Sequence, residues 1–228
     1  PHGTLCPQEL IEMDGMDCVC IGEGEYPTLE LCDALREGKD YTHIPSLWVK
    51  GKDGTVIKNP VRPFIEDLNT LPMSDFELFA YVTLAASSIA TAIVVVARGC
   101  LFSCTYCGNA QMRQVYPDRK HYARVKEPQK AIDYLKTVLN NHPYIKYINF
   151  RDAILNMYTD WFVDFMNLYK EQIHLPFTCN LRLDNMTEET VKLLKEAGVY
   201  MIDVGVESGD QEIRMKYLKR AMTDEKII

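Results

Sequence analysis

Three cysteines fall within eight residues of the chain: Cys100, Cys104 and Cys107, in the segment RGCLFSCTYCGN (98–109). Thiolates at such spacing bind zinc or iron–sulfur clusters, and the number of ligands separates the two. Structural zinc sites use four ligands, and the next candidates along the chain, His121 and Cys179, lack a zinc-like spacing. A ferredoxin-type run also needs a fourth nearby cysteine. Three thiolates suit a [4Fe–4S] cluster with one iron open to a small molecule.

The segment before the cysteines must position them. TAIVVVA (91–97) is uncharged and rich in β-branched residues, which predicts a parallel strand buried on both faces. The cysteine loop then starts at a strand's carboxyl end, where α/β sheets and barrels place their sites. The uncharged stretch 78–97 is long enough to span a bilayer. Its hydroxyl side chains and the acidic flank at Asp75 and Glu77 argue against a membrane span.

Strand and helix patterns alternate through the second half of the chain. Strands are predicted at 91–97, 144–150, 176–184 and 199–207, and helices at 127–142, 159–172, 187–198 and from 208 onward. Thr187 can cap the third helix, Gly198 can end it, and Ser208 with Gln211 can form a capping box on the fourth. This rhythm predicts an α/β fold with about four β/α units of a parallel barrel. A closed barrel needs more strands, so we interpret the chain as a fragment.

The first part has a different pattern. MDCVCIG (16–22) and the helix expected near 27–38 form one β–α unit of a doubly wound sheet. LWVKGKDGTVIKN (47–59) predicts a hairpin, and the prolines that follow mark a linker. We therefore predict three regions: the end of a doubly wound domain at 1–46, a hairpin and proline-containing linker at 47–88, and the truncated barrel at 89–228.

Composition narrows the class of protein. A hydrophobic fraction of 47% with 25% charged residues is typical of a soluble globular chain. The net charge of −7 argues against a broad nucleic-acid-binding surface. The polar start carries no basic flank, so no signal peptide is expected. Eight cysteines without a disulfide-scaffold pattern then predict the reducing cytoplasm.

CLFSCTYC resembles the Cys-x3-Cys-x2-Cys motif of the radical S-adenosylmethionine (radical SAM) enzymes, with Tyr106 as the aromatic before the last cysteine. Its place after a first barrel strand, between Gly99 and Gly108, strengthens the resemblance. The first part is similar to the last third of the cobalamin-binding domain that precedes one class of these enzymes. The motif Asp-x-His-x-x-Gly, which carries the cobalt ligand in some such domains, does not occur in this chain. Cobalamin is therefore an expectation for the full-length protein only.

The resemblance implies a TIM-barrel-like core that binds a [4Fe–4S] cluster through Cys100, Cys104 and Cys107. It also implies contacts with SAM by five residues: Tyr106, Asp152 with the amino group, Arg182, Glu207 with the ribose, and Arg220 with the carboxylate. Structural explanations are a loop charge for Asp152, an ion pair for Arg182 and a solvated helix end for Arg220. Many relatives carry two acids where this chain reads Asp152-Ala153.

The implied reaction is reductive cleavage of SAM to a 5′-deoxyadenosyl radical, for methyl transfer, cyclisation or rearrangement. The expected partners are a small-molecule substrate and a reductase, ferredoxin or flavodoxin that donates electrons, with no nucleic acid and no membrane. Two other functions fit the cysteines alone. One is an iron–sulfur electron-transfer or regulatory module without SAM chemistry, and the other is a structural zinc-binding domain.

Overall fold

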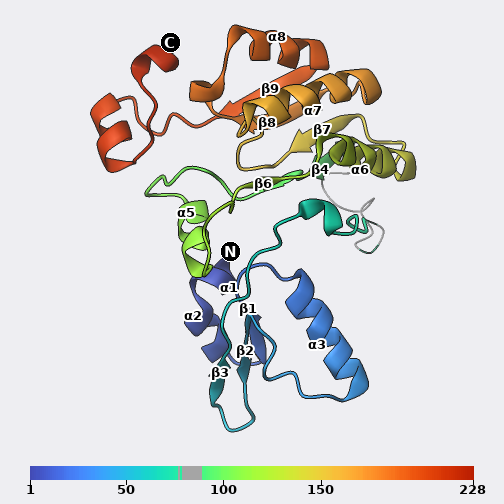
Figure 1. Cartoon of the computed structure of the whole chain (residues 1–228), viewed down its shortest axis with the longest axis vertical. Helices are drawn as coiled ribbons and strands as arrows, with labels where there is room; N and C mark the ends of the chain where they lie inside the picture. The colour runs from blue at the N-terminus through green and yellow to red at the C-terminus, as the bar shows by residue number, and fades with distance from the viewer. Residues whose placement is uncertain (77, 79–88) are drawn as a thin grey trace. The chain divides into compact units, whose positions relative to one another are not determined.

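The computed structural model describes residues 1–76, 78 and 89–228 (Figure 1). The chain divides into two compact units, one made of residues 1–66 and 106–122 and the other of 67–105 and 123–228. A compact unit is not the same as a domain of the predicted kind, so the predicted domain boundaries after residues 46 and 88 stay predictions. Most of the uncharged stretch 78–97 that was weighed as a membrane span lies outside the described residues. No helix in the described part of the chain is long and apolar enough to cross a bilayer.

A four-stranded parallel sheet forms the centre of the second unit. Its strand order is β4 (Thr91–Val94), β7 (Tyr147–Phe150), β8 (Phe177–Leu181) and β9 (Val199–Val204). The connecting helices α6 (Pro128–Asn141), α7 (Thr159–Gln172) and α8 (Glu188–Ala197) lie side by side along the sheet (Figure 1). The predicted α/β architecture is therefore confirmed. The four strands run in one direction, so their carboxyl ends share one edge of the sheet.

One face of this sheet is packed against the helices. Phe150 of β7 contacts the rings of Phe165, Tyr169 and Phe177 edge-on, with centroids 5.6 to 5.9 Å apart. All four rings are fully buried, and burial of such side chains is the main stabilising contribution to the unit. The prediction that TAIVVVA is buried on both faces is wrong. Ile93 and Val95 point to the other face and are 46% and 48% exposed, since the helices cover one face only.

Of the predicted helix ends, those of α8 are confirmed and the capping box after residue 207 is not. The Thr187 hydroxyl accepts a hydrogen bond from the N–H of Thr190 at the start of α8, and Gly198 ends the helix at φ +90°. The Ser208/Gln211 capping box is wrong. The segment forms a short π-helix, Ile213–Tyr217, and the N–H of Ile213 donates to Oδ1 of Asp210 at 3.0 Å.

The first unit contains a three-stranded antiparallel sheet, in the order β1 (Cys18–Cys20), β2 (Leu47–Lys50) and β3 (Val56–Lys58). The expected succession of strand and helix is present as β1 followed by α3 (Glu25–Glu37), and the predicted hairpin as β2 and β3. In the described residues β1 pairs antiparallel with the hairpin and not with a parallel strand of a doubly wound sheet. The hairpin belongs to the same sheet as β1. Short helices complete the unit: α1 (His2–Leu5), α2 (Pro7–Glu12), α5 (Gly108–Met112) and η4 (Arg113–Val115).

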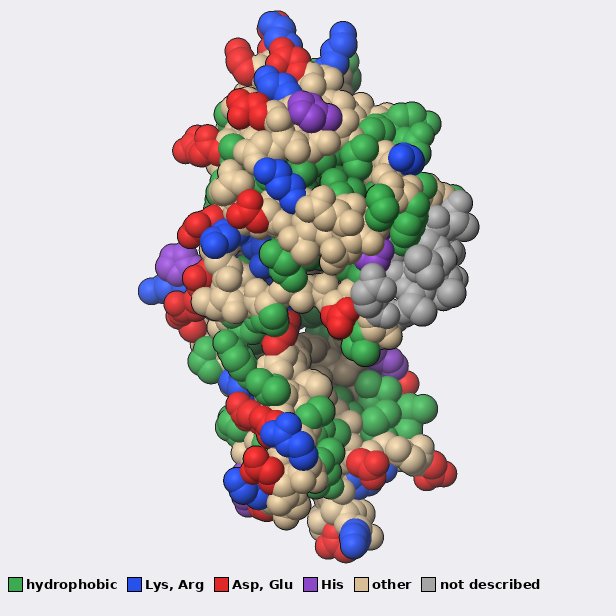
Figure 2. All heavy atoms as spheres, turned by 90° about the vertical axis from the view of Figure 1, so that its right-hand side faces the viewer, with side chains coloured by type: hydrophobic (Ala, Val, Ile, Leu, Met, Phe, Trp, Pro, Cys, Tyr) green, Lys and Arg blue, Asp and Glu red, His purple; other side chains and the backbone are tan. Residues whose placement is uncertain are grey.

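The remaining short elements belong to the second unit. They are β5 (Ala97–Arg98), which pairs with β6 (Arg124–Val125), and the 3₁₀ turns η1 (Leu68–Thr70), η5 (Leu183–Asn185) and η7 (Asp224–Lys226). Acidic and basic side chains are interspersed on the face of the molecule shown in Figure 2, without a continuous basic area. This agrees with the net charge of −7.

Replacing the central ring of the packed face tests this description of the core. Phe150→Ala should lower the free energy of unfolding by about 3–5 kcal/mol, because it removes a buried ring and leaves a cavity. Tyr200→Ala, which truncates a ring that is 75% exposed, should cost less than about 1 kcal/mol. Urea denaturation followed by circular dichroism measures both variants. Equal losses would contradict the assignment of the core.

Candidate functional site

The cysteine loop leaves the sheet at the carboxyl end of β4. Gly99 turns the chain at φ +78°, a conformation that favours glycine, directly before Cys100. Cys104 is buried, Cys100 and Cys107 are half-buried, and none of the three forms a disulfide. Thr105 anchors the loop, because its N–H donates to the carbonyl of Leu218 (3.1 Å) and its hydroxyl to that of Tyr217 (2.9 Å). The end of the π-helix therefore supports the loop that carries the cysteines.

Asp152 lies just beyond β7 and is 1% exposed. Its Oδ1 accepts hydrogen bonds from the N–H groups of Val96 (2.9 Å) and Ala97 (2.6 Å), in the link that leads to the cysteines. Its Oδ2 is buried and has no hydrogen-bond partner among the described residues. Burial raises the pKa of Asp152 to about 6, against the lowering effect of the backbone hydrogen bonds. A buried acceptor with one oriented and one unpaired oxygen fits a positively charged donor such as an ammonium group.

Arg182 follows β8, and its side chain is 1% exposed. Nε and Nη2 donate to the two carboxylate oxygens of Asp184, at 2.8 and 2.6 Å. Cζ lies 3.6 Å from the ring centroid of Phe102, a residue of the cysteine loop. Burial alone would lower the pKa of Arg182. The hydrogen bond and the charge of Asp184, with smaller contributions from Cys104 and Cys100, outweigh burial, so the pKa is raised above its ordinary value. The ion pair considered from the sequence is present, and it lies against the cysteine loop.

Asn156 is a buried residue of this site that the sequence analysis missed. Its Oδ1 accepts from the N–H of Arg182 and its Nδ2 donates to the carbonyl of Arg182, both at 3.0 Å. A second missed amide is Asn180 on β8, whose Nδ2 donates to the carbonyl of Asp152 at 2.8 Å. Asn156 lies in a loop, where an asparagine is a weak signal because turns use this residue for many purposes.

Glu207 and Arg220 come together at Gly205, just after β9. A Cβ added to Gly205 would overlap Oε1 of Glu207 and would lie 3.3 Å from Nη2 of Arg220. Nη2 of Arg220 donates to the carbonyl of Gly205 at 2.5 Å. Glu207 has φ +69°, an uncommon conformation for a residue with a side chain, which often marks a functional site.

The expectation that Arg220 ends a long outer helix is wrong. The π-helix is short, Lys219 reverses the chain at φ +50°, and the N–H of Arg220 donates to the carbonyl of Arg214 at 2.9 Å. Arg220 is consequently 8% exposed and is not a solvated helix end. Tyr106 lies in the loop between Cys104 and Cys107 and is 46% exposed, so its role as a cofactor contact stays a prediction.

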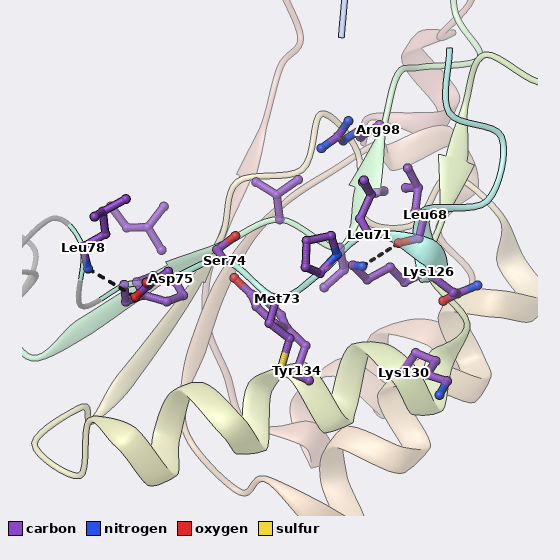
Figure 3. Close-up of a pocket in the computed structure, with 17 residues that line it drawn as sticks. Leu68, Leu71, Met73, Ser74, Asp75, Leu78, Arg98, Lys126, Lys130 and Tyr134 are labelled. Atoms are coloured by element: carbon purple, nitrogen blue, oxygen red, sulfur yellow. Dashed lines mark hydrogen bonds between the residues drawn. The ribbon is translucent and has the colours of Figure 1, made fainter. Parts of the chain in front are cut away.

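A cavity of about 640 Å³ lies beside β4, β5 and the start of α6 (Figure 3). Its lining combines the basic side chains of Arg98, Lys126 and Lys130 with the carboxylate of Asp75 and with apolar side chains that include Leu71 and Met73. Nζ of Lys126 donates to the carbonyl of Leu68 at 2.7 Å, and burial together with the charge of Arg98 lowers the pKa of Lys126. Asp152, Arg182, Glu207 and Arg220 are not part of the lining of this cavity, so the cavity flanks the carboxyl-end site.

The family profile described as "Radical SAM superfamily" matches residues 94–228. The chain belongs to this superfamily. An uncharacterised methyltransferase of Pyrococcus horikoshii is 26% identical over 231 residues, which cover 100% of this chain and 48% of that protein. An anaerobic magnesium-protoporphyrin IX monomethyl ester cyclase of Rubrivivax gelatinosus is 26% identical over 92% of this chain and 38% of the cyclase. The chain thus spans less than half the length of these relatives.

Two solved structures share the fold of this superfamily member. The cobalamin-dependent SAM radical enzyme OxsB, with aqua-cobalamin and SAM bound, superposes with a TM-score of 0.76 over 99% of this chain and 32% of OxsB, at 19% identity. The radical SAM methyltransferase TsrM of Kitasatospora setae, with tryptophan and a SAM analogue bound, gives a TM-score of 0.73 over 99% of this chain and 44% of TsrM, at 19% identity. The likeness extends over the first unit as well as the barrel strands.

The pKa of Asp152 predicts a dependence of stability on pH. Its folded-state pKa of about 6 lies above the value of about 3.9 in an unfolded chain, so the folded state binds the proton more tightly. The stability that this group contributes is present below pH 4 and is lost as pH rises through 6. Asp152→Asn, which keeps an acceptor for Val96 and Ala97 but cannot ionise, should therefore exceed wild type by about 1–3 kcal/mol at pH 7.5.

Urea titrations of wild type and Asp152→Asn at pH 4.0 and pH 7.5 measure this difference. The gap should be small at pH 4.0 and should open toward pH 7.5. A gap of the same size at both pH values would show that the carboxyl group does not titrate as its burial implies.

Proposed function

We propose that this chain is the cluster- and SAM-binding part of a radical SAM enzyme that acts with methyl transfer or cyclisation chemistry. The observation that carries the proposal is the buried carboxylate of Asp152, oriented by the N–H groups that lead to the cysteine loop, with one oxygen left without a partner among the described residues. Cys100, Cys104 and Cys107 would hold a [4Fe–4S] cluster. When bound, the cluster supplies an electron that cleaves SAM and yields the 5′-deoxyadenosyl radical.

The chain's own residues would bind and orient SAM beside that cluster. Oδ2 of Asp152 would accept a hydrogen bond from the amino group, and Arg220 would donate to the carboxylate while Glu207 accepts from the ribose hydroxyls. These side chains lie after β7 and β9, at the same edge of the parallel sheet as the cysteine loop after β4. Direct contacts of Arg182 and Tyr106 with SAM stay predictions.

The relatives favour methyl transfer and cyclisation over other outcomes, because their names include methyltransferases and cyclases. Cobalamin belongs to the proposal for the full-length protein, since the similar solved structures are cobalamin-dependent enzymes. A small-molecule substrate and an external reductase, ferredoxin or flavodoxin complete the proposed reaction. The eight cysteines form no disulfide in the structure, which supports a reducing cytoplasm as its place.

The rival functions leave specific features without a purpose. An iron–sulfur electron carrier has no need of an unpaired buried carboxylate oxygen or of Glu207 in a left-handed conformation. A structural zinc site would need a fourth ligand. Anaerobic reconstitution followed by reduction in the presence of SAM decides between them. We expect 5′-deoxyadenosine to form, and a brown protein that neither binds nor cleaves SAM would favour the carrier.

The three cysteines should be individually required for the cluster. Cys104→Ala should reduce iron and sulfide after reconstitution to background, because each thiolate holds one iron. Cys18→Ala, which changes a half-buried thiol of the first unit, should leave iron content unchanged. Iron analysis and absorbance of the purified variants measure this. Full iron content in Cys104→Ala would contradict the assignment.

Arg220→Ala should weaken SAM binding by about 1.5–3 kcal/mol, the cost of losing a hydrogen bond to a charged group. Iron content should stay at the wild-type level. Isothermal titration of the anaerobic, reconstituted protein with SAM measures the affinity, and Arg36→Ala, which removes an exposed arginine of α3, is the matched control. Equal affinity in Arg220→Ala and wild type would refute the role of Arg220.

A further inference from the structure

Arg182 is fixed on three sides by groups that its role in SAM binding would not require. The carboxylate of Asp184 holds the guanidinium through two hydrogen bonds. Asn156 holds the main chain of Arg182 through both its N–H and its carbonyl. The ring of Phe102 covers the guanidinium at 3.6 Å. A side chain held in this way has one position, so it can in turn position what it touches.

The contact with Phe102 connects this arrangement to the cysteine loop. Phe102 lies between Cys100 and Cys104 in the sequence. Phe102 and Cys100 are both half-buried and pack against the apolar cluster formed by Ala97, Ala123, Ile154 and Met157. The face of the ring attracts a cation, and the attraction is stronger where both are removed from water. Arg182 therefore holds the part of the loop that carries the first two cysteines.

The position of the charge has an electrostatic consequence for the loop. The guanidinium of Arg182 lies 3.6 Å from the ring of Phe102, which stands two residues after Cys100 and two before Cys104. Buried charges are screened less than exposed ones, so a cation here acts on any charge that develops at the cysteines. Nη1 of Arg182 is buried and has no hydrogen-bond partner among the described residues. It remains available to donate to a sulfur acceptor.

We propose that Arg182 is a positioning residue that holds the cysteine loop through Phe102 and raises the reduction potential of the cluster bound there. The inference rests on the proposed function, because it requires a cluster on Cys100, Cys104 and Cys107. Reduction adds one negative charge to the cluster, and a fixed cation nearby stabilises the reduced form. Asp184 has the opposite sign and tempers this effect while it orients the guanidinium.

The two members of the ion pair give variants with opposite expected effects. Arg182→Gln removes the cation and should lower the midpoint potential. Asp184→Asn removes the counter-charge, keeps the cation on the ring, and should raise the potential. Arg182→Lys keeps the positive charge but replaces the planar guanidinium by an ammonium group, and its midpoint potential should be close to that of wild type. Reductive titration of the reconstituted protein, followed by electron paramagnetic resonance, measures all four proteins.

Lys170→Gln is the matched control. Lys170 pairs with Glu196 at 2.9 Å between the ends of α7 and α8, at the edge of the sheet opposite to the cysteine loop. It changes the net charge by the same amount as Arg182→Gln, and it should leave the potential unchanged. A shift of equal size in Lys170→Gln would show that net charge alone is responsible and would overturn the inference.

Loss of the buried arginine leaves Asp184 without its partner, so Arg182→Gln is the variant most prone to misfold. Should it fail to fold, Asp184→Asn decides, and a potential at or below wild type overturns the inference. The double variant Arg182→Gln/Asp184→Asn, which leaves no unpaired charge, should lie below wild type but above the single arginine variant. A wild-type protein that binds no cluster contradicts the proposed function, whereas a loaded cluster with unchanged potentials contradicts this inference alone.

Discussion

The carboxylate of Asp152 is the interaction on which the arrangement of the site depends. It joins the end of β7 to the segment between β4 and β5 and to the start of β5, through the N–H groups of Val96 and Ala97. The cysteine loop starts three residues after that link, so the direction in which it leaves the sheet depends on this anchor. Burial of this carboxyl group raises its pKa to about 6.

Each further group at this edge of the sheet is held by a neighbour. Asn180 fixes the carbonyl of Asp152, and Asn156 fixes the main chain of Arg182. Gly205 leaves room for Glu207 and Arg220, since a side chain there would displace the carboxylate of Glu207. Such a chain of contacts orients side chains without help from a bound molecule, which is the condition for binding a cofactor in one orientation.

Much of this fold could be predicted from the sequence because its periodicity is strong. The spacing of apolar residues locates α6 within 127–142 and α7 within 159–172, and the β-branched run at 91–97 locates β4. The ends of α8 are marked by Thr187 and Gly198. The spacing of the three cysteines gave the family. Contacts between distant segments could not be predicted in this way. The approach of Arg220 to Gly205 depends on a short π-helix and on a left-handed residue, Lys219, neither of which has a sequence pattern. An ion pair was one explanation offered for Arg182, but its partner Asp184 and its stacking on Phe102 depend on the tertiary fold.

The anchoring of Thr105 on the π-helix has a consequence for the order of folding. The hydroxyl of Thr105 and the carbonyl of Tyr217 are separated by 112 residues along the chain. Closing so long a loop costs chain entropy, and such contacts form only after the intervening elements have come together. The part of the loop that ends at Thr105, with Cys100 and Cys104, is therefore one of the last parts of the second unit to become ordered. During synthesis these two thiols stay accessible until residues near 217 have left the ribosome, so a cluster of the proposed kind would be loaded only after the sheet has assembled.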